Sequence, residues 1–191
     1  PAAAVDSNLP DQLGAIANAR NFFTVFESDL TGIDFDKTQV SRYSIQNAAL
    51  VPASSVATSQ AIRIDFYQTD INDIPVYYPH YPKSNIFAII AGVTYPNSIA
   101  EAEYFHQSLL LDQNGTYPIK TTDEAFKELN ENQAYIANYD GTKSNILIQD
   151  AYLAYFAIDN LQEYLMPVIV FKGNDNFYAY VSAIKDEWIA K

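Results

Sequence analysis

From residue 61 onward the sequence consists of short runs of Ile, Val, Phe and Tyr, separated by Asp, Asn, Pro and Gly. Such runs are typical of β-strands, because branched and aromatic side chains pack well on a pleated surface. An alternating run at residues 99–111 also favours a strand, although Pro96 could open a helix there. A further strand is expected at 39–48, and a loop or a short helical turn at 52–59. The runs predict strands at residues 61–68, 74–78, 85–92, 145–149, 151–157, 165–172 and 176–184.

Two segments have helical spacing instead. In residues 9–30 apolar side chains recur at intervals of mostly three and four, with Asp11 placed to cap the helix and Gly32 just beyond it. A second, shorter helix is expected where Thr121 and Glu124 have the spacing of a capping box. The apolar stripe of this second helix consists of Ala125, Phe126 and Leu129.

The composition describes an ordered and acidic protein. Of the 191 residues, 49% are hydrophobic and 18% are charged, which provides enough apolar surface for one or two folded domains. The net charge of −12 disfavours binding to nucleic acid and to anionic membrane surfaces, because both carry negative charge. We therefore expect neither class of partner.

The chain contains no cysteine, which excludes disulfides, thiolate zinc sites and cysteine nucleophiles. The absence of cysteine and the 15 tyrosines are typical of bacterial proteins that act outside the cytoplasm. No run approaches the length of a membrane span, so any attachment to a membrane would depend on an anchor upstream of Pro1.

Two stretches of the sequence, residues 62–92 and 152–184, follow a similar order. Each has a strand, an acidic linker, a proline at the start of a second strand, a turn and a closing strand, so that Pro75 corresponds to Pro167 and Phe87 to Phe177. The alternative is that any two tyrosine-rich hairpins look alike.

The repeat predicts an α+β fold of two related halves, each a helix packed on an antiparallel β-sheet. We expect a flexible lead-in at residues 1–8, a first half at 9–112 and a second half at 113–191, or one compact unit containing both.

The second half resembles the extracytoplasmic domain of the YycI/YycH family and, more broadly, PepSY-type domains. The resemblance begins at residues 117–129 (YPIKTTDEAFKEL), which are similar to the family's helix motif, and continues at 153–156 (LAYF), where the family has GYY. Residues 167–171 and 177–183 stand for its last two strands, but Ile169 replaces the expected Trp of the PxW motif. The resemblance implies a membrane-tethered domain that regulates a sensor histidine kinase by protein contact, with no catalytic residues.

No catalytic motif is recognisable in the sequence. His80 and His106 are the only histidines, and neither has the sequence context of a catalytic triad or the spacing of a zinc site, so we read both as surface or hydrogen-bonded polar residues. Glu101 and Glu103 would share one face of a strand and could form the carboxylate pair of a hydrolase, which is the third function considered. We expect no enzyme activity, no cofactor and no bound metal.

The tyrosines of the two hairpins are the candidate binding residues. Alternate tyrosines on a sheet can belong to the core, while the others form an exposed platform that contacts a partner or stacks on sugars. We predict a protein-binding regulatory or sensory module at a bacterial cell envelope, with a carbohydrate-binding or structural cell-surface protein as the alternative. The expected partner is a protein, such as a membrane sensor. The candidate partner-binding aromatics are Tyr77, Tyr78, Tyr81, Tyr155, Tyr178 and Tyr180.

Overall fold

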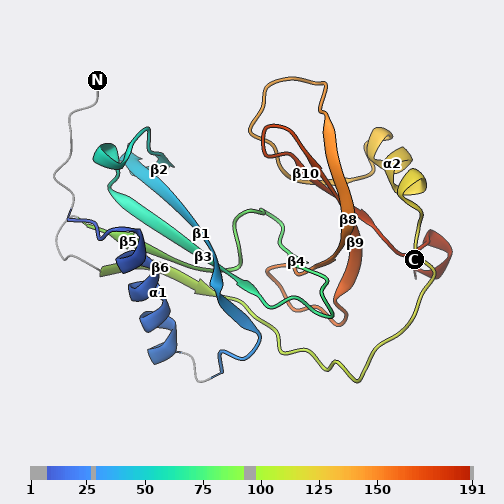
Figure 1. The fold of residues 1–191 in the computed structure, drawn as a ribbon, viewed down its shortest axis with the longest axis horizontal. Helices are drawn as coiled ribbons and strands as arrows, with labels where there is room; N and C mark the ends of the chain where they lie inside the picture. The colour runs from blue at the N-terminus through green and yellow to red at the C-terminus, as the bar shows by residue number, and fades with distance from the viewer. Residues whose placement is uncertain (1–7, 27–28, 93–97, 190–191) are drawn as a thin grey trace. The chain divides into compact units, whose positions relative to one another are not determined.

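The computed structural model describes residues 8–26, 29–92 and 98–189. It is an α+β protein, and the described residues contain two α-helices and two five-stranded sheets (Figure 1). None of the described helices has the length and apolar character needed to cross a membrane. The expected lead-in at residues 1–8 lies, apart from Asn8, outside the described residues.

The chain forms two compact units that each contain two separate stretches of sequence. The first unit comprises residues 1–68 and 85–106, and the second comprises 69–84 and 107–191. The chain therefore passes between units at 68–69, 84–85 and 106–107, rather than once at 112–113 as the sequence suggested. The loop 69–84, which connects two strands of the first unit, belongs to the second unit.

The first unit has an antiparallel sheet in the order β2-β1-β3-β5-β6. Its strand β3 covers the residues 61–68 that were predicted from their branched and aromatic side chains, whereas β1 begins earlier than expected and β6 ends well before residue 111. The segment 52–59, expected to be a loop or a short helical turn, contains the end of β2 and a short 3-10 helix, η1 (Val56–Thr58). The strands are β1 (Ile33–Gln46), β2 (Ala49–Pro52), β3 (Ala61–Gln68), β5 (Ile86–Ala91) and β6 (Ser98–Tyr104).

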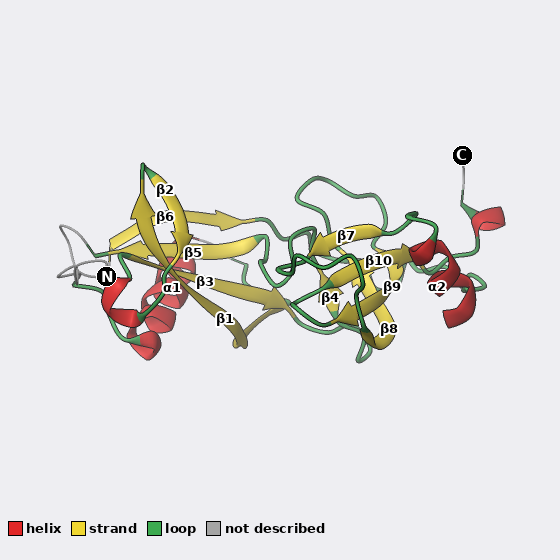
Figure 2. Cartoon of the chain, turned by 90° about the horizontal axis from the view of Figure 1, so that it is seen from above, coloured by secondary structure: helices red, strands yellow, loops and turns green. Residues whose placement is uncertain are grey.

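Helix α1 (Gln12–Phe26) packs on one face of this sheet (Figure 2). The Asp11 side chain caps it as expected, because its Oδ1 accepts a hydrogen bond of 2.7 Å from the Gly14 amide. The buried side of the helix is lined by Ala15, Ala19 and Phe23, which lie four residues apart and meet a core of isoleucines and Phe66. The small alanines let the helix backbone lie close to the sheet.

The second unit has a sheet in the order β4-β8-β9-β10-β7, in which only β4 runs parallel to its neighbour. Residues 145–149 and 151–157, predicted as two strands, contribute to one continuous strand, β8, and β7 was not predicted because its four residues are too few to show a pattern. The strands are β4 (Val76–Tyr77), β7 (Tyr135–Asn138), β8 (Ile148–Phe156), β9 (Met166–Gly173) and β10 (Tyr178–Ser182).

Helix α2 (Thr122–Asn130) lies against one face of this second sheet. The capping box is confirmed: the Glu124 amide donates to Thr121 Oγ1 at 3.2 Å, and the Thr121 amide donates to Glu124 Oε2 at 2.7 Å. Ala125 packs with Ile169 and Phe171 of β9. The last short helix, η2 (Asp186–Trp188), follows β10 near the C-terminus.

The structure does not make Pro75 and Pro167 equivalent positions in two halves. Pro75 precedes the two-residue β4, and its carbonyl accepts a hydrogen bond of 2.8 Å from the Tyr155 amide. Pro167 belongs to β9 and lies opposite the same Tyr155 in the antiparallel register. Both prolines therefore lie in the second unit, on either side of one residue of β8.

Candidate functional site

The six candidate aromatics all lie in the second unit, but most of them are core residues. Tyr77, Tyr78, Tyr178 and Tyr180 are at most 9% exposed. Tyr81 is half-buried against the same cluster, and Tyr155 is half-buried one residue along β8 from Ala154, which faces that cluster. Because side chains alternate along a strand, Tyr155 points to the opposite face. These residues do not form an exposed platform in this conformation.

Tyr77 is at the centre of a cluster that we call the tyrosine core, which consists of Tyr77, Tyr81, Tyr152, Tyr178 and Tyr180. Its ring centroid lies 4.2 Å from that of Tyr81 and 5.9 Å from those of Tyr152 and Tyr180. Its hydroxyl is 2.5 Å from the Tyr152 hydroxyl, and the Tyr180 hydroxyl donates a hydrogen bond of 3.0 Å to the Tyr78 carbonyl. The loop 69–84 thus contributes the ring that holds the cluster together.

Burial shifts the pKa values of several hydroxyls in the tyrosine core upward. Burial raises the pKa of Tyr152 to about 12 and raises the pKa of Tyr77, Tyr81 and Tyr180 above the ordinary phenol range. The hydroxyls therefore stay protonated and serve as hydrogen-bond donors and acceptors rather than as bases. Among the residues that the structure describes, no group of acidic residues and histidines has the arrangement of a metal site.

The two histidines and the pair Glu101 and Glu103 are not part of the tyrosine core. His80 is exposed in a turn of the second unit. His106 is half-buried in the first unit, two residues beyond the end of β6 rather than on a strand, and burial lowers its pKa against the opposing attraction of Asp29. Glu101 and Glu103 both lie exposed on the edge strand β6.

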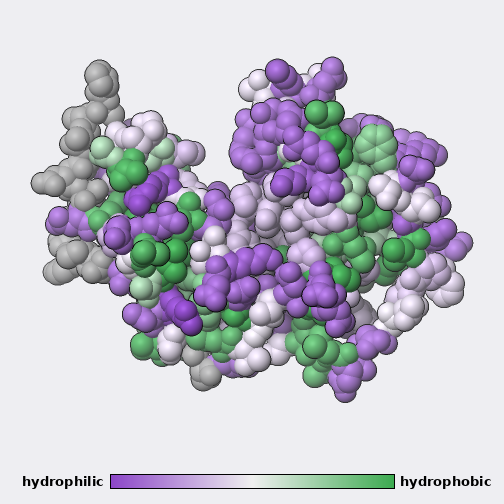
Figure 3. Space-filling view, viewed as in Figure 1, coloured by the Kyte–Doolittle hydropathy of each residue, from purple (hydrophilic) through white to green (hydrophobic). Residues whose placement is uncertain are grey.

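A different set of aromatic side chains is exposed on the second unit. Tyr117, Tyr164 and Trp188 are 48%, 67% and 54% exposed, and they come from three segments, 107–119, 157–165 and 186–189. We call this the aromatic–leucine surface; it consists of these three residues with Leu109, Leu110, Leu111 and Leu161, all of them exposed. Figure 3 shows apolar side chains, in green, at the surface over the second unit.

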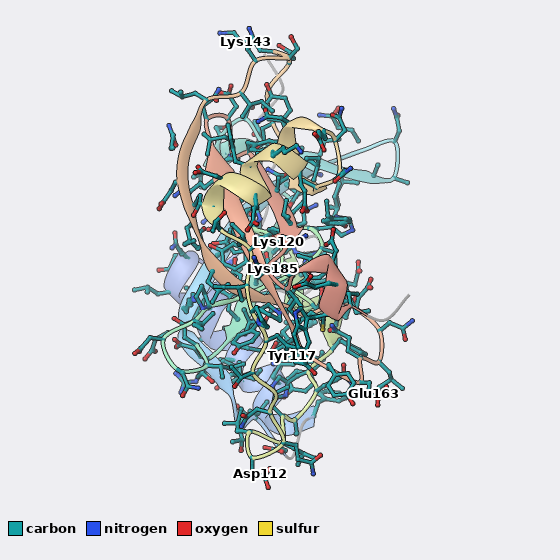
Figure 4. All side chains as sticks on the ribbon, turned by 90° about the vertical axis from the view of Figure 1, so that its right-hand side faces the viewer. Asp112, Tyr117, Lys120, Lys143, Glu163 and Lys185 are labelled. Carbon is teal, nitrogen blue, oxygen red and sulfur yellow. The ribbon has the colours of Figure 1, made fainter. Side chains whose placement is uncertain are left out.

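Contacts connect the three segments that carry these side chains. The Gln162 amide donates a hydrogen bond of 3.0 Å to Gln107 Oε1, which joins the first two segments. The ring centroids of Tyr117 and Trp188 lie 6.4 Å apart. The pKa of Tyr164 is raised by the Glu163 carboxylate and, to a smaller extent, by Tyr117, so the two tyrosines are close enough to interact electrostatically. Figure 4 shows Tyr117 between Lys185 and Asp112, with Glu163 at one side.

The surface is anchored to the folded core through residue 120. The Lys120 amide donates to the Ala183 carbonyl at 2.7 Å, so the chain next to Tyr117 pairs with the end of the sheet. The buried Lys120 ammonium lies 2.8 Å from Glu128 Oε1 and 2.7 Å from Asp186 Oδ1. Burial lowers the pKa of Lys120, but the hydrogen bonds to the two carboxylates outweigh it and leave that pKa raised. These two ion pairs connect η2, which contains Trp188, to α2.

The charged side chains within the three segments are all acidic, and Lys120 and Lys185 lie just outside them in the sequence. The segments 107–119, 157–165 and 186–189 contain no lysine, arginine or histidine. Their carboxylates belong to Asp112, Asp159, Glu163, Asp186 and Glu187.

The sequence predictions missed Tyr117, Tyr164 and Trp188 as candidate binding residues because all three lie outside the predicted strands. One signal was present: the three consecutive leucines at 109–111 are followed by Asp112 and a turn at Asn114, where a solvated loop has no need of large apolar side chains.

The chain matches no protein-family model, and neither a curated protein nor a solved structure matches it significantly.

Proposed function

We propose that this protein is a non-catalytic, protein-binding module with a regulatory or sensory role at the outer side of a bacterial cell envelope, and that it binds its partner through the aromatic–leucine surface. The observation that carries the proposal is the group of large apolar side chains that three connected segments expose. Single exposed apolar residues are ordinary on any protein, but a contiguous set is a mark of an interaction surface.

The composition of the surface favours a protein as its partner. Tyrosine and tryptophan are enriched in protein–protein interfaces, because they combine a large apolar area with a polar group and lose little conformational entropy on binding. Tyr117 and Trp188 meet both conditions, and each is about half exposed. Backbone hydrogen bonds connect the segment of Tyr117 to the end of the sheet and to the start of η2, which contains Trp188. Such residues commonly supply most of the binding energy.

The location and the partner class rest on the sequence. The lack of cysteine fits a protein outside the cytoplasm, and the resemblance to the YycI/YycH family suggests a membrane sensor protein as the partner. In the same proposal the two units are related copies of one plan, a helix on an antiparallel sheet. The packing of Phe23 on the first sheet and of Ala125 on the second supports this relation.

Carbohydrate binding is the second candidate function. Trp188 Nε1 donates a hydrogen bond of 3.2 Å to Glu187 Oε1, and the Tyr117 ring lies beside it, so exposed aromatic faces and a carboxylate oxygen occur together. Sugars stack on such faces and donate their hydroxyls to carboxylates. Retention of the full chain on a glycan array, lost in Trp188→Ser, would select this function over protein binding.

The test of the proposed function is photo-cross-linking in living cells. A photoreactive amino acid replaces Tyr164 in the full chain, and in a matched control it replaces Leu147, which is similarly exposed in the second unit but lies outside the aromatic–leucine surface. We expect a cross-linked envelope protein from position 164 that is absent from position 147 and lost when Trp188→Ser is added. Equal cross-linking from the two positions, or none from position 164, would contradict the proposal.

A further inference from the structure

We infer that the aromatic–leucine surface binds a basic amphipathic segment of its partner, one that presents apolar side chains together with arginine or lysine. This inference rests on the proposed function and specifies its partner. It comes from the charges around the surface rather than from the apolar residues themselves.

The acidic residues of the surface have no basic counterparts within it. The nearest cations along the chain are already engaged: Lys120 is buried between Glu128 and Asp186, and Lys185 lies 3.6 Å from Glu124 of α2. Of the five carboxylates, only Asp186 is part of one of these ion pairs. A partner that approached with acidic side chains would be repelled, whereas a basic one would be attracted over a distance of about 10 Å.

The position of one carboxylate favours arginine in particular. Glu187 holds its carboxylate at the edge of the Trp188 indole through the 3.2 Å hydrogen bond. A guanidinium placed over that ring could contact the π-face and donate to the carboxylate at the same time.

The first unit contains this arrangement within its own fold. The Arg63 guanidinium lies 3.5 Å from the centroid of the Phe87 ring and makes hydrogen bonds of 2.8–3.1 Å to the Asp65 carboxylate. There an arginine satisfies an aromatic face and an acid together. At the aromatic–leucine surface the aromatic face and the acid are present, and the partner would supply the arginine.

The experiment uses the full chain and two synthetic helical peptides with the same leucine face. One peptide has arginine and lysine on its polar face, and the other has glutamate at the same positions. Trp188 is the single tryptophan, so its fluorescence reports binding at the surface directly. We expect the basic peptide to change this fluorescence and to bind at least about tenfold more tightly than the acidic one at low salt, with affinity falling as salt is added.

A pair of charge variants gives the matched control. Glu163→Gln with Glu187→Gln should weaken binding of the basic peptide severalfold, whereas Glu101→Gln with Asp73→Asn, which removes the same charge from exposed sites outside the surface, should not. Equal affinity for the two peptides, binding of neither, or equal effects of the two variant pairs would overturn the inference. Those results would leave the proposed function intact, because the cross-linking at position 164 tests it separately.

Discussion

The two units bury their cores in different ways. The helix-covered core of the first unit consists of alanine, isoleucine and phenylalanine, joined at its margin by a single tyrosine, Tyr104. In the tyrosine core of the second unit, the Tyr77 and Tyr152 hydroxyls bind each other and the Tyr180 hydroxyl binds a backbone carbonyl. An apolar core depends on volume alone, whereas a core of this kind depends on volume and on these hydrogen bonds. Three sets of substitutions and a change of pH test this difference between the two units.

The largest effect should come from removing volume in the first unit. Phe66 is fully buried, and its ring centroid lies 5.1 Å from that of Phe35 and 5.9 Å from that of Phe23. Phe66→Ala should lower the free energy of unfolding by about 3–5 kcal/mol, because it removes a buried ring and leaves a cavity. Hydrogen exchange of the β3 and β5 amides measures this change. A loss below about 1 kcal/mol would show that the core collapses around the gap.

Alkaline pH should act mainly on the second unit. The pKa of Tyr152 is raised to about 12, and those of Tyr77 and Tyr180 are raised further in the same direction, so the unfolded chain loses these protons at lower pH than the folded one. Stability is complete below pH ~10 and should fall by about 1.4 kcal/mol per pH unit for each such tyrosine as the pH rises above that value.

Hydrogen exchange followed from pH 9 upward in ~0.5-unit steps, after correction for the intrinsic pH dependence of exchange, should show β9 and β10 losing protection before β3 and β5. Simultaneous loss in the two units would contradict a difference between their cores.

Removing one hydroxyl should have a smaller effect, and it has a matched control on the same strand. Tyr180→Phe removes the buried hydroxyl that donates to the Tyr78 carbonyl, which also accepts a hydrogen bond of 3.3 Å from the Tyr81 amide, and should cost about 1.5 kcal/mol of unfolding free energy. Tyr178→Phe removes a hydroxyl for which the described residues show no hydrogen bond, and it should change stability by less than about 0.5 kcal/mol. Urea unfolding of the two variants, followed by Trp188 fluorescence, tests this difference; equal costs would show that the hydroxyl is not what matters.

The smallest effect should come from the α2 cap. Thr121→Ala removes the acceptor of the Glu124 amide and should cost about 1 kcal/mol. The hydrogen bonds from Thr121 lower the pKa of Glu124, so the contribution of that carboxylate is present above its ordinary pKa and is lost as the pH falls through the lowered one. Urea unfolding at pH 7 and at pH 3 measures both, and Thr121→Ser, which keeps the hydroxyl, should retain most of the stability.

The local predictions from sequence were the most successful. The capping box at Thr121 and the strand β3 follow from residue type and spacing over a few positions, and the structure confirms both. The common face of Tyr178 and Tyr180 also follows from the two-residue period, as does the opposite orientation of Tyr155. The period does not show which face of the sheet is covered, and tyrosine occurs both in cores and on surfaces. Most of the tyrosines predicted to form an exposed platform therefore lie in the buried core of the second unit.

The contacts between distant segments were not predictable in this way. Nothing in residues 69–84 shows that Tyr77 meets Tyr152, because pairing with β8 depends on a strand of only two residues. Similarly, Tyr117, Tyr164 and Trp188 are far apart in sequence, and only the folded second unit brings them to one surface.

The loop 69–84 has a consequence for the order in which the protein can fold. The Tyr77–Tyr152 hydroxyl contact joins residues 75 positions apart, and the Tyr180–Tyr78 hydrogen bond joins residues 102 positions apart. Contacts between residues so far apart in the sequence form slowly, because the chain loses conformational entropy before the contact can stabilise it. During synthesis, β4 leaves the ribosome well before β8 has been made, so the loop 69–84 cannot take up its position in the second unit until then. A fragment beginning at residue 107 would lack the loop 69–84 and with it Tyr77.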